Sequence, residues 1–483
     1  MTDAPSIEAP TKEGREQFGS RLGFILAAAG SAVGIGNLVG FPVNAAKNGG
    51  GAFLLLYAVF VFLICVPVMV AELSVGRHTA KDPLGAYRGL GGGAPGWLLA
   101  GWLSVITPFF IGVFYAVITV WIMGYLVEAA TGNLDQLADA SRFTDFIQSP
   151  AVFGYLVVVG IIVFLIIAGG VKNGIERAAK IMMPTLFVIL MLLVAFVLTL
   201  DNAFAGVAFY VVPDFAKLDA AVVSNALAQA FFSLSLGMGI MITYGSYMDA
   251  QSNLPGSART VAIVDTGVAF SAGLLILPAV FSFNPDVDTA ELSTSSVGLI
   301  FTFLPKIFLA LQDTIGYGGA SAVATVFFLL TFFAAITSLV SIIEVPTASL
   351  KEERSISRRR AISMIAGMTA VCTVAAAMSF GMVGALTEFV SYAGAPKSLF
   401  DVIYDMFYDT ILPLNGLLIC LFVIYRWKRA NFDAEIERGN PHYKGTLLER
   451  YINFSLGTFI PLILFLVFVN TVALKYFGKA FVG

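Results

Sequence analysis

Long apolar runs are the feature that most constrains what this chain can fold into. Eleven stretches follow one another, each with the roughly 20 apolar residues needed to cross the ~30 Å hydrocarbon core of a bilayer. They lie at 21–43, 51–76, 97–127, 152–170, 177–200, 223–248, 258–284, 322–350, 360–380, 399–426 and 450–475. A membrane-spanning segment must satisfy its own backbone hydrogen bonds, and these runs are too long for barrel strands. The sequence therefore predicts eleven transmembrane helices.

Composition supports a membrane protein and excludes several other classes. Of 483 residues, 58% are hydrophobic and 12% charged, whereas soluble proteins average about 45–50% apolar and 25% charged residues. The net charge is −3, which gives no basic stripe for a nucleic acid. The 3 cysteines and 2 histidines form neither a disulfide framework nor a zinc cluster. With no nucleophile–base pair or phosphate loop, we expect no enzyme, but a polytopic protein surrounded by lipid.

The distribution of Lys and Arg predicts the orientation of the chain. Residues 1–20 are polar and lack the apolar core of a signal peptide, so we expect a cytoplasmic tail there. A short apolar stretch at 296–311 contains a proline and a lysine. When it is not counted as a span, most of the 28 Lys and Arg fall inside, including the clusters at 351–360 and 426–429. This predicts a multi-pass protein of the inner (plasma) membrane, an external C-terminus, and an external re-entrant or capping helix at 296–311.

Two spans carry glycine clusters that favour unwound backbone. The first contains AGSAVGIGN at 29–37, and the sixth contains FFSLSLGMGIM at 231–241. Glycine costs ~1 kcal/mol per helix position relative to alanine, although close packing through small residues is the usual role of such a cluster in membranes. Two clusters five spans apart instead indicate inverted repeats, in which broken helices hold an anionic substrate group and cations at mid-membrane. The expected units are a first repeat at 21–200, a second at 223–426 with an external loop at 285–321, and a last span at 450–475.

Several long motifs resemble one transporter family. RLGFILAAAGSAVGIGNLVGFPVNAAKNGGGAFLLLYAVF at 21–60 closely resembles the first two spans of the neurotransmitter:sodium symporter family. The segments at 174–187, 231–248, 298–308 and 334–344 are also similar to that family. The resemblance implies an all-α leucine-transporter fold, with a 5+5 inverted repeat and broken helices 1 and 6. It also implies sodium-coupled import of an amino acid by alternating access, as in the bacterial leucine transporter.

The resemblance implies two sodium sites. The first comprises the Ala32 carbonyl, Asn37, Ser233, Asp265 and the carboxylate of the substrate. The second comprises the carbonyls of Gly30, Val33 and Ala334 and the hydroxyls of Thr337 and Ser338. Oxygen donors of this kind suit a hard cation and not a soft metal. The alternative for Thr337 and Ser338 is hydrogen bonding within their own helix.

Asp265 departs from the pattern of the family, which normally has asparagine there. An ionisable residue inside a membrane is costly and by default functional. Chloride-dependent members bind an anion near Tyr57, Gln229 and Ser233, and many chloride-independent ones have an acid where this chain has Ala269. Our hypothesis is that Asp265 supplies the compensating negative charge, so that transport needs no chloride. The alternative is that Asp265 takes a proton on the return step.

For the substrate, the resemblance implies an amino acid that carries its own carboxylate, because Gly34 replaces the aspartate of the monoamine transporters. The carboxylate would bind the amides of Ile35 and Gly36 and the Tyr115 hydroxyl. The ammonium would bind the carbonyls of Ala32, Phe232 and Ser233 and the Ser235 hydroxyl. The side-chain pocket would comprise Ile111, Phe232, Met238, Ser338 and Ile342, which suits a neutral hydrophobic side chain. Read singly, Met238 and Ile342 are ordinary core residues.

The gates of the family are only partly present. Arg15 and Glu352 are expected to form a cytoplasmic ion pair braced by Tyr247, although two solvated charges would be worth only about 0–1 kcal/mol. On the outside, Gly40 replaces the arginine of the family. Asp401 or Asp405 would then be a remnant of that gate, and closure would depend on Tyr115 and Phe232. We expect Glu72 to accept hydrogen bonds from the unwound sixth helix.

Two other functions stay open at this point. One is a proton-coupled or exchange transporter of the same fold, and the other is a membrane sensor that binds an amino acid without transporting it. The identity of the amino acid, the sodium:substrate ratio and the assembly, monomer or homodimer, are also left open by the sequence.

Overall fold

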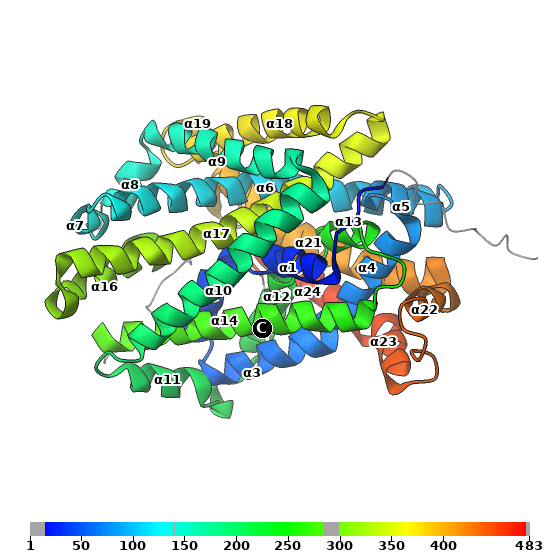
Figure 1. Cartoon of the computed structure of the whole chain (residues 1–483), viewed down its shortest axis with the longest axis horizontal. Helices are drawn as coiled ribbons and strands as arrows, with labels where there is room; N and C mark the ends of the chain where they lie inside the picture. Colours follow the sequence, from blue (N-terminus) through cyan, green and yellow to red (C-terminus); the bar gives the residue numbers. More distant parts are fainter. Residues whose placement is uncertain (1–14, 140, 284–298, 480–483) are drawn as a thin grey trace, which may run out of the picture.

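The fold is all-α, as the sequence predicts. The computed structural model describes residues 15–139, 141–283 and 299–479, and within them helices are joined by short connections and one two-stranded hairpin (Figure 1). The predicted tail at 1–20 and external loop at 285–321 therefore lie partly outside the described residues.

The first half of the chain contains long, closely spaced helices. Their bounds are α1 (Arg21–Ala32), η1 (Gly36–Gly40), α2 (Phe41–Lys47), α3 (Gly51–Phe60), η2 (Val61–Cys65), α4 (Val66–Thr79), α5 (Pro83–Leu90), α6 (Pro95–Ala130), α7 (Leu134–Leu137), α8 (Arg142–Ile147), α9 (Ala151–Ala168), η3 (Val171–Glu176), α10 (Arg177–Val197), α11 (Ala203–Val211) and η4 (Phe215–Lys217). Among these, η1, η2 and η3 are wider π-helical turns and η4 is a 3-10 turn.

The second half continues the pattern and contains the hairpin. Its helices are α12 (Ala220–Ser233), α13 (Ile240–Ser246), α14 (Leu254–Phe283), η5 (Leu299–Phe303), α16 (Leu304–Ala310), α17 (Gln312–Arg354), α18 (Arg358–Met378), α19 (Gly384–Thr387), α20 (Leu399–Ile403), η6 (Tyr404–Ile411), α21 (Leu412–Leu421), η7 (Phe422–Lys428), α22 (Arg429–Glu437), α23 (Leu447–Gly457) and α24 (Phe459–Phe477). Strands β1 (Val390–Tyr392) and β2 (Ala395–Lys397) pair antiparallel.

Nine helical segments of the described chain are long and apolar enough to cross a membrane. A tenth is the pair formed by α1 and the η1–α2 helix, which are bent by 54° relative to each other. The predicted sixth span consists of α12 and α13, and the predicted capping helix corresponds to η5 and α16, which are together too short to span. The chain is thus a multi-pass membrane protein, while the count of eleven and the inverted repeat stay predictions.

Both predicted breaks are present. Helix α1 ends at Ala32, and Val33 adopts an extended conformation before the chain turns into η1. Between α12 and α13, the residues Ser235, Gly237 and Gly239 all have positive φ angles, of 53°, 73° and 67°, which an α-helix of L-residues does not accommodate. Both breaks therefore fall within the glycine clusters, as expected.

Helix α1 lies near the centre of the molecule and contacts α10, α14 and α17 (Figure 1). Glu72 of α4 reaches the break in the sixth span, where its Oε1 accepts the Gly237 amide at 2.8 Å. This confirms the role expected for Glu72. Broken backbone at membrane depth must be satisfied by protein groups, and Glu72 supplies one such group.

Helices α4 and α13 pack through glycine. A Cβ added at Gly76 would lie 1.9 Å from the Ile242 carbonyl oxygen, so we expect Gly76→Ala to force these helices apart. Overpacking of this kind costs about 1–3 kcal/mol, and the melting temperature of the purified protein should fall by several degrees. Gly367→Ala in α18 is the control, because its Cβ would meet nothing within 4 Å. Equal melting temperatures for the two variants would contradict this packing.

Candidate sodium and substrate site

Asp265 lies at the point where the two broken spans meet. Its carboxylate Oδ1 accepts a hydrogen bond from Asn37 Nδ2 at 2.7 Å, and its Oδ2 accepts from the Ser233 hydroxyl at 2.8 Å. The Asn37 Nδ2 also lies 2.9 Å from the Ser233 hydroxyl. The structure therefore brings together the three side chains that the sequence analysis assigned to the first sodium site, from η1, α12 and α14.

The surroundings of Asp265 suit a monovalent cation. Asn37 and Asp265 are fully buried and Ser233 is almost so. Among the described residues, no Lys, Arg or His forms an ion pair with Asp265. A buried charge is normally paired or bound to a metal ion. The carboxylate and hydroxyl oxygens, with one negative charge to balance, suit a sodium ion, whereas Asn37 turns its Nδ2 toward them and its Oδ1 accepts the Gly34 amide at 3.1 Å.

Two further side chains lie in or beside this cluster. The Tyr57 hydroxyl donates to Asp265 Oδ2 at 3.0 Å and lies 3.0 Å from the Ser233 hydroxyl. Gln229 Nε2 donates to the Gly36 carbonyl at 3.1 Å, so it holds the broken first span from outside the cluster. The sequence analysis named both residues only as neighbours of a chloride ion, since no pattern predicts which hydroxyl reaches Asp265.

The candidate second sodium site lies where α1 ends against α17. The Ser338 hydroxyl lies 3.4 Å from the Gly30 carbonyl and 3.3 Å from the Val33 carbonyl, and is closest to that of Ser31, at 3.1 Å. These carbonyls are freed by the break in the first span, so their oxygens converge on α17.

Thr337 and Ala334 complete that predicted set only in part. The Thr337 hydroxyl donates within its own helix, to Phe333 and to the Ala334 carbonyl, at 3.0 and 3.1 Å. Its Cβ nonetheless lies against Gly30, 3.3 Å from where a Cβ would stand there. Thr337 thus borders the site, but its hydroxyl forms hydrogen bonds within its own helix, which is the alternative to a sodium ligand.

Backbone groups of the first break face Tyr115. The Ile35 amide donates to the Tyr115 hydroxyl at 3.0 Å. A Cβ at Gly34 would lie 2.4 Å from the Tyr115 hydroxyl oxygen and 2.7 Å from that of Ser338. A side chain at residue 34 would therefore displace the hydroxyls of Tyr115 and Ser338, so glycine fits the space at this position.

The structure shows few contacts among the residues of the predicted side-chain pocket. Ile111, Met238 and Ile342 are buried, and Phe232 lies beside Gly36. The Phe232 ring packs edge-on against Tyr408 with 4.3 Å between centroids, a neighbour that the sequence analysis did not name. The Ser235 hydroxyl donates to the Ser31 carbonyl at 3.0 Å. The roles of these residues and of Ala32 in binding stay predictions.

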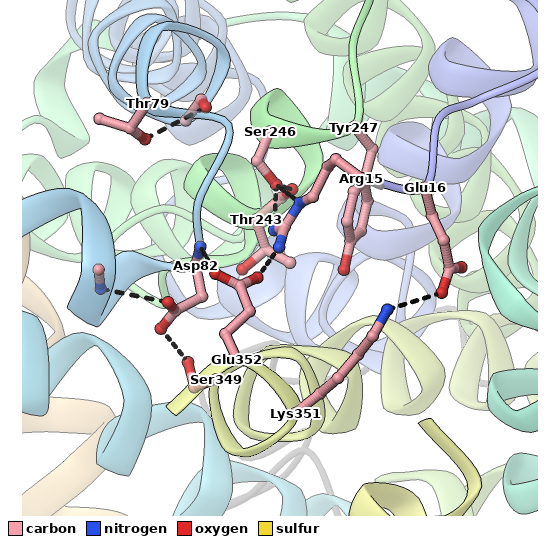
Figure 2. Close-up of polar contacts among 12 residues, drawn as sticks. Arg15, Glu16, Thr79, Asp82, Thr243, Ser246, Tyr247, Ser349, Lys351 and Glu352 are labelled. Carbon is pink, nitrogen blue, oxygen red and sulfur yellow. Dashed lines mark hydrogen bonds and ion pairs between the residues drawn. The ribbon is translucent and has the colours of Figure 1, made fainter. Parts of the chain in front are cut away.

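Near the N-terminal end of the broken first span, Arg15 forms an ion pair with Glu352 (Figure 2). Arg15 also donates to the Ser246 hydroxyl, and its guanidinium lies 4.7 Å from the centre of the Tyr247 ring. The side chains of Arg15 and Glu352 are 12% and 23% exposed. The predicted pair is therefore formed and largely shielded, which separates it from the alternative of two solvated charges.

A second carboxylate strengthens this cluster. Glu16 lies 3.1 Å from Lys351 Nζ (Figure 2). It also lies 3.4 Å from Arg358 and accepts the Val171 amide. Burial alone would raise the pKa of Glu16, but Arg358, the Val171 amide and Lys351 together hold that pKa below its ordinary value of 4.5. Because its pKa is lowered, Glu16 stabilises the folded state above pH ~4.5. This stabilisation is lost as the pH falls through the lowered pKa of Glu16.

The two aspartates predicted as remnants of the outer gate have different contacts. Asp401 belongs to a capping box, in which it and Ser398 begin α20. Asp405 Oδ1 lies 3.0 Å from Lys475 of α24, which also pairs with Asp409 at 2.6 Å. Asp405 is thus paired with a lysine from the last span.

A comparison with protein families fits this geometry. The model of the sodium:neurotransmitter symporter family matches residues 15–144 and 142–480. The chain belongs to this family. It is therefore a sodium-dependent transporter by family, and the resemblance found in the sequence is confirmed.

Relatives of the chain extend from bacteria to mammals. It is 35% identical over 471 residues to the uncharacterized sodium-dependent transporter YhdH of Bacillus subtilis, covering 95% of this chain and 98% of that one. It is 37% identical over 362 residues to the uncharacterized sodium-dependent transporter MJ1319 of Methanocaldococcus jannaschii, covering 72% of each chain. It is 28% identical over 340 residues to the bovine sodium- and chloride-dependent taurine transporter, covering 60% of this chain and 54% of that one.

A solved structure shares the fold. The crystal structure of MhsT in complex with L-phenylalanine is 38% identical in sequence, with a TM-score of 0.82 over 94% of this chain and 99% of that one. The leucine-transporter type of fold predicted from the sequence is thus confirmed.

The ion pair of Arg15 with Glu352 makes a testable prediction. In a background without native cysteines, Thr243→Cys places a thiol on the fully buried α13 beside this cluster. We expect Glu352→Gln to raise the rate at which a polar maleimide labels that thiol several-fold, because an unpaired Arg15 no longer holds the N-terminal segment closed. Glu353→Gln is the matched control, since the pair of Glu353 with Arg88 is more exposed. An unchanged labelling rate in Glu352→Gln would argue against a gate.

Proposed function

We propose that this symporter imports a neutral hydrophobic amino acid together with sodium ions, across the inner (plasma) membrane and by alternating access. The observation that carries the proposal is the buried Asp265 carboxylate, which has three side-chain donors and no cationic partner among the described residues. A cation at this point would balance its charge in a medium where unpaired charges are costly.

Two sodium sites follow from the donor sets. In the first, Asp265, Ser233 and Asn37 would hold the ion together with the Ala32 carbonyl and the carboxylate of the substrate. In the second, the carbonyls of the first break would hold it, together with Ala334, Thr337 and Ser338. Sodium bound at both sites would tie the first span to α12, α14 and α17, and so favour the state in which the substrate site is formed.

The amino acid class rests on the backbone near the first break. The amides of Ile35 and Gly36 and the Tyr115 hydroxyl are donors for a carboxylate, and glycine at 34 leaves the substrate to supply that charge itself. Burial of Ile111, Met238 and Ile342 offers an apolar surface without a charge. MhsT, the structural relative, was crystallised with L-phenylalanine, an amino acid of this class.

Chloride independence rests on the hydroxyl donors. In chloride-dependent relatives, the resemblance places the anion near Tyr57 and Ser233. In this chain, both of these hydroxyls donate to Asp265 Oδ2, at 3.0 and 2.8 Å. The carboxylate thus takes the donors that a chloride ion would need, and it carries the same charge.

The proton-coupled and sensor alternatives make different predictions from sodium symport. We expect a few apolar amino acids to raise the melting temperature of the purified protein in sodium chloride but not in potassium chloride, because only a ligand of the folded state stabilises it. The measurement is a thermal-shift screen of the twenty amino acids in both salts. An equal shift in both salts would favour proton coupling or a sensor. Uptake against a concentration gradient in proteoliposomes then separates a transporter from a sensor.

Replacing chloride by gluconate tests the role of Asp265. Wild-type uptake in sodium gluconate should equal that in sodium chloride, whereas Asp265→Asn should regain activity only when chloride is present. Asp313→Asn, in the exposed first turn of α17, serves as the control. Loss of wild-type uptake in gluconate would refute chloride independence.

A further inference from the structure

A long apolar groove lies on the side of the protein away from the broken spans. It has a volume of about 670 Å³ and is bounded by α6, α9, α17 and α18, four helices that contact one another (Figure 1). Its lining is apolar except for two threonines, and it is widened by the small residues Ala116, Gly160, Ala366 and Ala370. The volume falls within the ~300–1,000 Å³ typical of ligand sites.

The groove follows the direction of the spans. Along α18 it is lined from Ile362 to Met378, a distance of about 24 Å at the 1.5 Å rise of a helix. This covers most of a ~30 Å hydrocarbon core. Its rim includes Val157 and Ile161 of α9, which are 61% and 53% exposed and so face the lipid. An extended acyl chain has this length and direction, whereas water does not fill so apolar a space.

One end of the groove carries positive charge. Arg359 and Arg360 lie in the first turn of α18, shortly before Ile362, and both are exposed. Among the described residues neither forms an ion pair, whereas Arg358 beside them is paired with Glu344 at 2.6 Å. The predicted orientation places this end on the cytoplasmic side, where basic clusters between spans bind anionic lipid headgroups. Guanidinium groups match the geometry of phosphate.

The inner wall of the groove is also the outer wall of the substrate site. Leu339 and Ile343 of α17 line the groove, and the residues directly before them in the chain are Ser338 and Ile342. Ala116 of α6 likewise lines it and follows Tyr115. A chain lying in the groove would therefore press on the backs of the two helices whose other faces form the candidate site.

We propose that the groove binds one acyl chain of an anionic phospholipid, with its phosphate held by Arg359 and Arg360. The bound chain supports α6 and α17 from behind the substrate site, so that loss of the lipid loosens that site.

Filling the groove tests this proposal without use of sodium or substrate. A Cβ at Gly160 would meet nothing within 4 Å, so the side chain of Gly160→Phe starts in open space and occupies the groove, while Gly367→Phe on the exposed face of α18 is the matched control. In delipidated protein, dioleoyl phosphatidylglycerol should raise the melting temperature of the wild type and of Gly367→Phe by about 3 °C or more. Gly160→Phe should show no such shift. Equal shifts in all three proteins would overturn the site.

The preference for an anionic headgroup is tested separately. Phosphatidylcholine should stabilise the wild type less than phosphatidylglycerol, and the double variant Arg359→Gln/Arg360→Gln should abolish the difference. Equal effects of the two lipids on the wild type would overturn the anionic preference. Native mass spectrometry of wild-type protein needs no variant: one phosphatidylglycerol molecule retained through detergent exchange supports the site, and none retained overturns it.

Discussion

A single buried carboxylate determines how the centre of this protein is organised. Asp265 contacts Asn37 from the first broken span and Ser233 from the second, so one charge joins the two places where the membrane helices unwind. Both breaks expose backbone groups that lipid cannot satisfy. A cation bound between these elements would balance the carboxylate and hold the breaks together, and sodium coupling and the shape of the substrate site would then depend on each other.

The same broken first span connects the site to the inner surface. Helix α1 follows Arg15 and Glu16, whose partners lie on η3, α13, α17 and α18. It ends at the carbonyls that face Ser338. A shift of α1 would therefore change the ion pairs at one end and the cation ligands at the other. This is a physical route by which sodium at mid-membrane could control access from the cytoplasm.

Much of the fold could be predicted because membrane helices have a strong signal. Apolar runs predicted the helices, and clusters of glycine at 29–37 and 231–241 predicted the two breaks. Long motifs such as that at 21–60 then identified the family. The contacts of single side chains were harder to predict. No pattern shows that Tyr57 reaches Asp265, that Thr337 bonds within its own helix, or that Lys475 pairs with Asp405, because each depends on how distant helices pack.

The most direct test is sodium binding to purified protein in chloride-free buffer, with Asp265→Asn beside the wild type. We expect the wild type to bind radioactive sodium saturably without amino acid, and the variant to lose at least about tenfold in affinity, which corresponds to 1.4 kcal/mol. Restoration of binding in the variant by added chloride would identify the missing charge as the cause. Equal sodium affinity of the two proteins without chloride would contradict a sodium site at Asp265 and favour a proton there instead.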